Sequence, residues 1–191
     1  MNEMIRKWAG CSIRREEIVD STNRQARLWA KEGAPHGAAV VAQQQTAGRG
    51  RRGRSWVSKP GAGLWLSIVL RPDITESDFP MLPFAAALAA ADACRDVSGA
   101  DVRIKWPNDL VLDGRKITGI LVEREGDAAV MGIGINVQQQ ADDFPPEIRE
   151  KAGSLEMLTG KTISMADLEA ALLGHIERRM DNFDFLTEYT A

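Results

Sequence analysis

The chain has 191 residues, a length typical of one domain, and 44% of them are hydrophobic, enough for a substantial core. The formal net charge of −3 argues against a generally basic nucleic-acid-binding surface. Two cysteines, Cys11 and Cys94, are too few for a disulfide framework and indicate a reducing, cytoplasmic location. We find no N-terminal targeting stretch and no run of about 20 apolar residues, so no membrane segment is expected.

The first part of the chain predicts strands and a helix around a long loop. In chain order, we expect a strand at 13–20, a helix at 25–33, a strand at 38–45, an irregular loop at 46–63 and a strand at 64–70. Ser21 or Thr22 is suited to cap the helix, and Gly33 with Pro35 is suited to end it.

The second part mixes helices with further strands. In chain order, we expect an Ala-rich helix at 79–97, a strand at 102–106, a hairpin at 110–125, a strand at 128–137, a loop or short helix at 142–150 and an amphipathic helix at 164–186. Strands and helices do not alternate strictly. The pattern therefore predicts one α+β domain over residues 1–191, with a mixed sheet and packed helices.

The most unusual segment is GRGRRGR at residues 48–54, which we call the arginine motif. It holds four arginines and three glycines, and no acidic residue lies between 46 and 59. Glycines let the backbone approach a ligand, and arginines match carboxylates and phosphates. The motif suits a loop that folds over a small anion, and its arginines should repel one another until that anion arrives. A basic loop for nucleic acid is the alternative from this segment alone.

Two further segments can contribute to the same site. In KWPND at 105–109, Pro107 ends a strand and directs Asn108 and Asp109 into a cleft, where Asp109 can help to hold Mg²⁺. Lys116 follows the hairpin turn and can reach the same cleft, although an ordinary exposed turn lysine fits the pattern too.

The segment GIGIN at 132–136 leaves one strand face bare at Gly132 and Gly134 and ends in Asn136, whose amide suits an adenine edge. A strand packed tightly against a helix is the alternative. His36 and His175 show no spacing typical of a metal site or a nucleophile, and no Cys/His cluster suggests structural zinc.

Together these segments resemble the biotin–protein ligase family. STN at 21–23, the arginine motif preceded by Gln45, KWPNDL at 105–110, GRKITGILVE at 114–123 and GIGIN occur in the family's order over about residues 13–180. The resemblance implies a catalytic domain like that of class II aminoacyl-tRNA synthetases. It also implies ATP-dependent activation of biotin to biotinyl-5'-AMP, with Mg²⁺, and transfer to a lysine of a biotin carboxyl carrier protein.

The resemblance implies a role for each matching residue. Catalysis is expected from Lys116, Arg51 and Asp109, with Asp109 also favouring Mg²⁺. Biotin binding is expected from Ser21, Thr22, Asn23, Gln45, Arg49, Gly50, Arg51, Lys116 and Gly119. ATP or adenine binding is expected from Arg49, Arg54, Trp56, Lys105, Asn108 and Asn136.

The resemblance also bears on partners and on other domains. We expect neither an N-terminal helix-turn-helix domain nor a C-terminal small β-barrel, and therefore no DNA binding; pairing as a homodimer is compatible with the family. Three alternatives stay open: a lipoate–protein ligase of the same fold, a nucleic-acid-binding module that uses the arginine motif, and an inactive acceptor-binding module.

Overall fold

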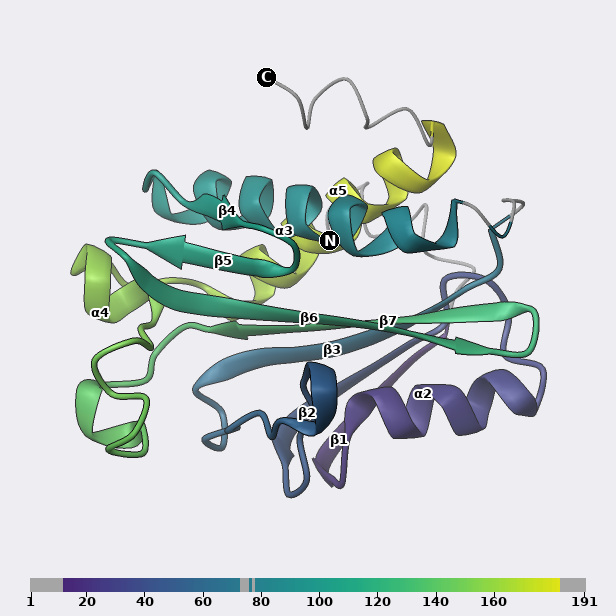
Figure 1. Ribbon diagram of the computed structural model, residues 1–191, viewed down its shortest axis with the longest axis horizontal. Helices are drawn as coiled ribbons and strands as arrows, with labels where there is room; N and C mark the ends of the chain where they lie inside the picture. The colour runs from purple at the N-terminus through teal and green to yellow at the C-terminus, as the bar shows by residue number, and fades with distance from the viewer. Residues whose placement is uncertain (1–11, 73–75, 77, 183–191) are drawn as a thin grey trace.

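The computed structural model describes residues 12–72, 76 and 78–182. Within this part of the chain a seven-stranded sheet has the order β1-β2-β3-β7-β6-β5-β4 (Figure 1). Strands β1 and β2 pair in parallel and the other neighbours pair antiparallel. The strands are β1 Ile13–Val19, β2 Ala39–Gln45, β3 Gly63–Leu70, β4 Arg103–Lys105, β5 Asp109–Leu112, β6 Arg115–Glu125 and β7 Ala128–Asn136. The predicted α+β class with a mixed sheet is confirmed.

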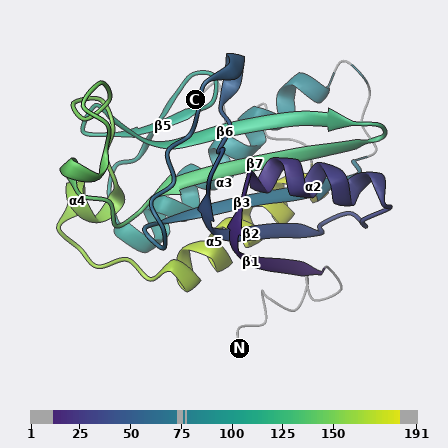
Figure 2. The same cartoon turned by 90° about the horizontal axis from the view of Figure 1, so that it is seen from below.

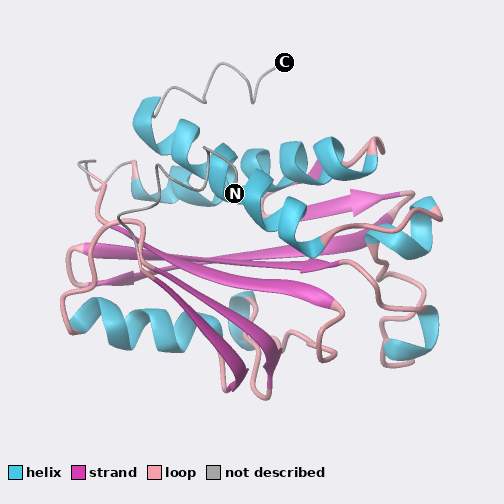
Figure 3. Cartoon of the chain, turned by 180° about the vertical axis from the view of Figure 1, so that it is seen from behind, coloured by secondary structure: helices cyan, strands magenta, loops and turns pink. Residues whose placement is uncertain are grey.

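Helices cover the two faces of the sheet unequally. Helices α3 (Leu82–Ser98) and α5 (Met165–Asn182) pack on one face, and α2 (Thr22–Lys31) lies alone on the opposite face (Figures 1 and 3). The short α4 (Leu155–Thr159) lies near one end of the sheet. Because α2 covers only part of its face, the rest of that face is available to loops.

The side chains of strand β3 alternate between two hydrophobic cores, one on each face of the sheet. Leu64, Leu66 and Ile68 belong to the main core beneath α3 and α5. The alternate residue Val69 packs in a smaller core with helix α2. Each buried leucine or isoleucine contributes about 1.5–3 kcal/mol. Ser67 is fully buried and lies on the α2 face, so a polar group stands where the pattern would place an apolar one.

Several predicted boundaries were wrong. Helix α2 begins at Thr22 rather than at residue 25, and Ser21 holds the N-cap position without a side-chain capping bond. Pro80 and Pro83 split the helix predicted at 79–97 into a 3₁₀ turn at Phe79–Met81 and α3. The loop predicted at 46–63 is confirmed up to residue 62 and contains a 3₁₀ turn at Arg51–Gly53, and the loop or short helix expected at 142–150 is confirmed, with a 3₁₀ turn at Ala141–Asp143. Helix α5 is described to Asn182, so predicted residues 183–186 lie outside the described residues.

The buried face of α5 matches the prediction, with Leu168, Leu172 and Ile176 in the core. Asp113 and Gly114 form the predicted turn between β5 and β6, and both have positive φ.

None of the helices in the described part of the chain has the length and hydrophobicity that crossing a membrane would require.

Candidate active site

The loop that carries the arginine motif crosses the sheet on the face that α2 leaves open (Figure 2). Its two arms are joined by hydrogen bonds from Trp56 N to Gly48 O (2.8 Å) and from Gly50 N to Arg54 O (2.7 Å). Between them, Arg52 adopts a left-handed conformation with φ of 56°. The motif is therefore a folded hairpin-like loop, and its short internal bonds set the positions of its arginines.

Glycines of the sheet receive the Trp56 side chain. A Cβ at Gly119 would lie 2.6 Å from Trp56 Cζ3, and one at Gly134 would lie 2.8 Å from Trp56 Nε1. Gly119 and Gly134 face each other across β6 and β7, so they form one bare platform. Trp56 also meets Trp65 edge to face, with ring centroids 6.2 Å apart. The indole Nε1 is buried and has no hydrogen-bond partner.

Gly132 packs against a different element from Gly134. A Cβ there would lie 1.9 Å from Asn23 Oδ1, at the start of α2. Tight packing of a strand against a helix, the alternative for this segment, therefore holds at Gly132, whereas Gly134 accommodates an aromatic ring from the loop. The two glycines of GIGIN thus allow helix α2 and the Trp56 ring to pack closely on the same face of the sheet.

A buried polar cluster lies at the start of α2. Gln45 Oε1 accepts hydrogen bonds from Thr22 N (2.9 Å) and Thr22 Oγ1 (3.1 Å), and Gln45 Nε2 donates to Ser58 Oγ (3.1 Å). Ser67 Oγ lies 2.6 Å from Asn23 Oδ1 and 2.8 Å from Thr22 Oγ1. These mutual bonds fix the side chains before any ligand arrives, which suits a site with few but well-placed polar groups.

Lys116 is held at both its backbone and its side chain. Its Nζ lies 2.7 Å from Asp109 Oδ1 and 5.5 Å from the centroid of the Trp56 ring. Its N–H donates to Lys151 O (2.7 Å), and its carbonyl accepts from Gly153 N (2.9 Å). Lys116 is thus a fixed cation and not an ordinary exposed turn lysine.

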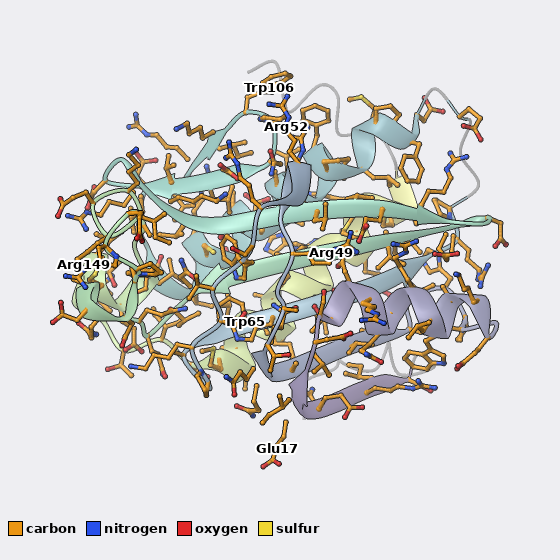
Figure 4. The ribbon with its side chains drawn as sticks, turned by 60° about the horizontal axis from the view of Figure 1, so that its bottom comes forward. Glu17, Arg49, Arg52, Trp65, Trp106 and Arg149 are labelled. Atoms are coloured by element: carbon orange, nitrogen blue, oxygen red, sulfur yellow. The ribbon has the colours of Figure 1, made fainter. Side chains whose placement is uncertain are left out.

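Two adjoining cavities meet at these residues. The inner cavity lies over the sheet next to the start of α2 and is lined by all nine residues predicted for biotin: Ser21, Thr22, Asn23, Gln45, Arg49, Gly50, Arg51, Lys116 and Gly119. The outer cavity has Arg52, Arg54, Trp106 and Asp109 in its wall. Figure 4 shows Arg52 and Trp106 near each other at the edge of the molecule. Five residues line both cavities: Gly50, Arg51, Trp56, Asn108 and Lys116.

Two residues predicted for ATP or adenine lie outside both cavity linings. Lys105 is an exposed residue of β4. Asn136 is 4% exposed, and its amide is already bonded: Nδ2 donates to Gly153 O (3.0 Å) and Oδ1 accepts from Gln139 Nε2 (3.1 Å). In this arrangement Asn136 supports the segment that holds the Lys116 backbone.

The expectation that the arginines repel one another without partners was wrong for two of them. Arg49 pairs with Glu123, and Arg51 Nη1 donates to Asn108 Oδ1 at 2.7 Å. Both residues remain exposed, but their guanidinium groups bond to oxygen acceptors that β6 and the segment after Pro107 offer.

Sequence reasoning missed Ser67 and Glu123, which hydrogen-bond to residues that line the inner cavity, and Arg52 and Trp106, which line the outer cavity. Ser67 is the one polar residue in the strand LWLSIVL, and this interruption could have identified it. Glu123 follows the site face of β6 at the two-residue spacing of Gly119 and Leu121, so strand periodicity could have placed it there.

The described residues contain no group of three or more His, Cys, Asp or Glu side chains that could hold a metal ion. His175 Nε2 lies 2.8 Å from Asp96 Oδ2, and His36 Nδ1 accepts from Arg71 N (3.1 Å). Neither histidine lines the two cavities.

Comparison with known proteins places this geometry in a family. Residues 16–139 match the model of the biotin/lipoate A/B protein ligase family. The chain is 40% identical over 173 residues to the bifunctional ligase/repressor BirA of Bacillus spizizenii, covering 88% of this chain and 53% of that protein. It is 43% identical over 131 residues to the biotin–[acetyl-CoA-carboxylase] ligase of Paracoccus denitrificans, covering 65% and 54% respectively. The chain thus spans about half the length of the curated relatives it matches.

Solved structures agree with these matches. The biotin protein ligase of Aquifex aeolicus in complex with biotin and ATP superimposes with a TM-score of 0.81 at 32% identity, covering 92% of this chain and 72% of that one. The Leishmania major enzyme in complex with biotinyl-5-AMP gives 0.73 at 30% identity, covering 93% and 75%. This chain belongs to the biotin/lipoate A/B protein ligase family.

Proposed function

We propose that the protein is an ATP-dependent biotin–protein ligase. Biotin would be activated to biotinyl-5'-AMP with release of pyrophosphate and then transferred to a lysine of a biotin carboxyl carrier protein. The observation that carries this proposal is the position of Lys116 and Arg51, two cations in the shared wall of two adjoining cavities. Such a wall suits a reaction that must bring two anions together.

The inner cavity suits biotin. The polar cluster of Thr22, Asn23 and Gln45 offers neutral donors and acceptors, as a ureido ring requires, and the Gly119–Gly134 platform with Trp56 offers apolar surface. The outer cavity, with Arg52, Arg54 and the exposed ring of Trp106, suits a nucleotide and its phosphates. The carboxylate of biotin would then lie beside Lys116.

The chemistry follows from charge. A carboxylate oxygen attacks the α-phosphorus of ATP, the bond from that phosphorus to the bridging oxygen breaks, and pyrophosphate leaves. Both reactants are anions, so Lys116 and Arg51 lower their repulsion and stabilise the charge that develops. The acceptor amine then attacks the carbonyl carbon, loses a proton, and AMP leaves. Between the two steps the mixed anhydride needs protection from water, which the arginine loop can provide.

Mg²⁺ fits this site as a companion of ATP. Mg²⁺ usually binds through one or two carboxylates together with substrate phosphates, and Asp109 supplies one carboxylate in the wall of the outer cavity. When bound, the ion would neutralise phosphate charge. Asp109 also pairs with Lys116, so the same carboxylate would orient the lysine and help to hold the ion.

Biotin is preferred over lipoate because the named relatives and solved neighbours are biotin ligases. A nucleic-acid-binding module is disfavoured because Arg49 and Arg51 already bond to acceptors of the site itself, Glu123 and Asn108. The test is incubation of the protein with ATP, Mg²⁺, biotin and a biotin carboxyl carrier domain. A gain of one biotin on a single lysine of the carrier is expected by mass spectrometry, and the carrier with that lysine changed to arginine is the control. An unmodified carrier would contradict the proposal.

A further inference from the structure

The carboxylate of Glu123 joins three parts of the site. Its Oε2 accepts a hydrogen bond from Arg49 Nη1 at 3.2 Å, and its Oε1 lies 3.1 Å from Arg49 Nη2, so the loop arginine forms a hydrogen-bonded ion pair with it. Glu123 Oε2 also accepts from Asn23 Nδ2 at 3.0 Å, and Arg27 Nη1 lies 3.3 Å from Oε1. One carboxylate thus contacts the arginine loop, the floor of the inner cavity and helix α2.

The surroundings of Glu123 favour a specific pairing. Its side chain is 16% exposed, so its charge has lost much of its water and needs partners inside the protein. Arg27 lies closer to Glu125, at 2.8 Å, than to Glu123. Arg49 is the closer of the two arginines to Glu123, at 3.1 Å against 3.3 Å for Arg27. Arg49 belongs to the arginine loop, and Figure 4 shows it over the middle of the sheet.

We infer that Glu123 is a positioning residue that anchors the arginine loop over the inner cavity through Arg49 while it holds Asn23 in the cavity floor. A loosened loop would release biotin and the adenylate faster, and this catalytic consequence of the inference rests on the proposed function. The anchor itself is a property of the protein without ligand. Arg49 is 46% exposed, so the anchor should weaken as salt rises.

Glu125 provides a matched control. It lies two residues further along β6 and faces the same side of the sheet. Its side chain is 14% exposed, and its partners in the described part of the chain are Arg27 and Lys31, both on α2. Glu123→Gln and Glu125→Gln therefore each remove one negative charge from the same strand, but of these two glutamates Glu123 contacts the loop and Glu125 contacts α2. Glutamine at 123 can still accept a hydrogen bond from Asn23.

The test is amide hydrogen exchange across residues 46–58 without ligand, at low and high salt. In Glu123→Gln, exchange should be roughly threefold to tenfold faster than in the parent protein at low salt, the range that a charged pair of partial exposure supports. The difference should shrink at high salt, and Glu125→Gln should match the parent at both. Unchanged loop exchange in Glu123→Gln, or equal acceleration in both variants, would overturn the inference.

A double variant separates the anchor from general loosening. Arg49→Gln should accelerate loop exchange as much as Glu123→Gln, and combining the two should add little, because each removes the same contact. Fully additive effects would contradict the anchor. Thermal unfolding of each variant checks the fold. These measurements of hydrogen exchange need no catalysis. If the parent protein lacked biotin-dependent activity, the proposed function would be refuted, but the exchange rates of the variants would still test the anchor.

Discussion

Lys116 Nζ lies 2.7 Å from Asp109 Oδ1, across the neighbouring strands β6 and β5. This ion pair directs the ammonium group into the wall that the two cavities share. The carboxylate therefore orients the cation from the wall of the outer cavity. The position of the Lys116 ammonium group beside Arg51 depends on this pair.

Removal of the Lys116 ammonium should nearly abolish adenylate formation. Lys116→Ala is expected to lower the rate of biotinyl-5'-AMP synthesis by at least about 100-fold, the size typical for loss of a group that stabilises transition-state charge. The circular dichroism spectrum should stay unchanged. Lys31→Ala, which removes an exposed lysine from α2, is the control and should retain the parent rate. A Lys116→Ala rate within a few-fold of the parent would refute this role.

The Gly134 platform predicts a steric conflict that can be rescued. Gly134→Ala places a Cβ 2.8 Å from Trp56 Nε1, so the ring must move. We expect a loss of about 1–3 kcal/mol of stability, as for an overpacked core, and weaker biotin binding. Adding Trp56→Leu should recover most of the stability, measured by chemical denaturation. If the second change makes the loss larger, Trp56 and Gly134 do not conflict.

Asn136 should matter for stability and for the position of Lys116. Asn136→Ala removes the bond to Gly153 O and leaves Gln139 Nε2 without its acceptor, which should cost about 1–3 kcal/mol. Because Gly153 N bonds Lys116 O, the adenylation rate should fall as well. Gln138→Ala, at an exposed neighbouring position, should change stability by less than about 0.5 kcal/mol. Equal effects of both changes would argue against the relay from Asn136 to Lys116.

Asp20 predicts a pH dependence of stability at the start of α2. Burial alone would raise the pKa of Asp20, but hydrogen bonds from Gln25 and from Ser21 N, with Arg24 nearby, lower it below its usual value. A carboxyl with a lowered folded pKa stabilises the protein above its unfolded pKa of about 4 and loses that effect as pH falls. Asp20→Asn should therefore lower the thermal midpoint at pH 7, and the difference should shrink as the pH falls below about 4. A difference that grows on acidification would contradict this assignment.

Much of this site could be predicted because its residues fall in short motifs. The segments STN, GRGRRGR and KWPND each supply neighbouring side chains, so a motif places several residues at once. Contacts between distant segments could not be predicted in the same way. The pairing of Arg49 with Glu123 joins residues 74 positions apart, and it depends on the loop crossing β6. The burial of Asn136 depends on the path of residues 151–153, for which the sequence offers no periodic pattern.

ATP–pyrophosphate exchange tests the central claim most directly, because it isolates the activation step from acceptor docking. With Mg²⁺ and ATP, exchange of labelled pyrophosphate into ATP should require biotin, should not be supported by lipoate at the same concentration, and should be lost in Lys116→Ala. Exchange that lipoate supports as well as biotin would assign the chain to the lipoate branch of the family. Exchange absent with both acids, in a protein shown to be folded, would contradict the account of Lys116 and Arg51 as the cations that join two anions.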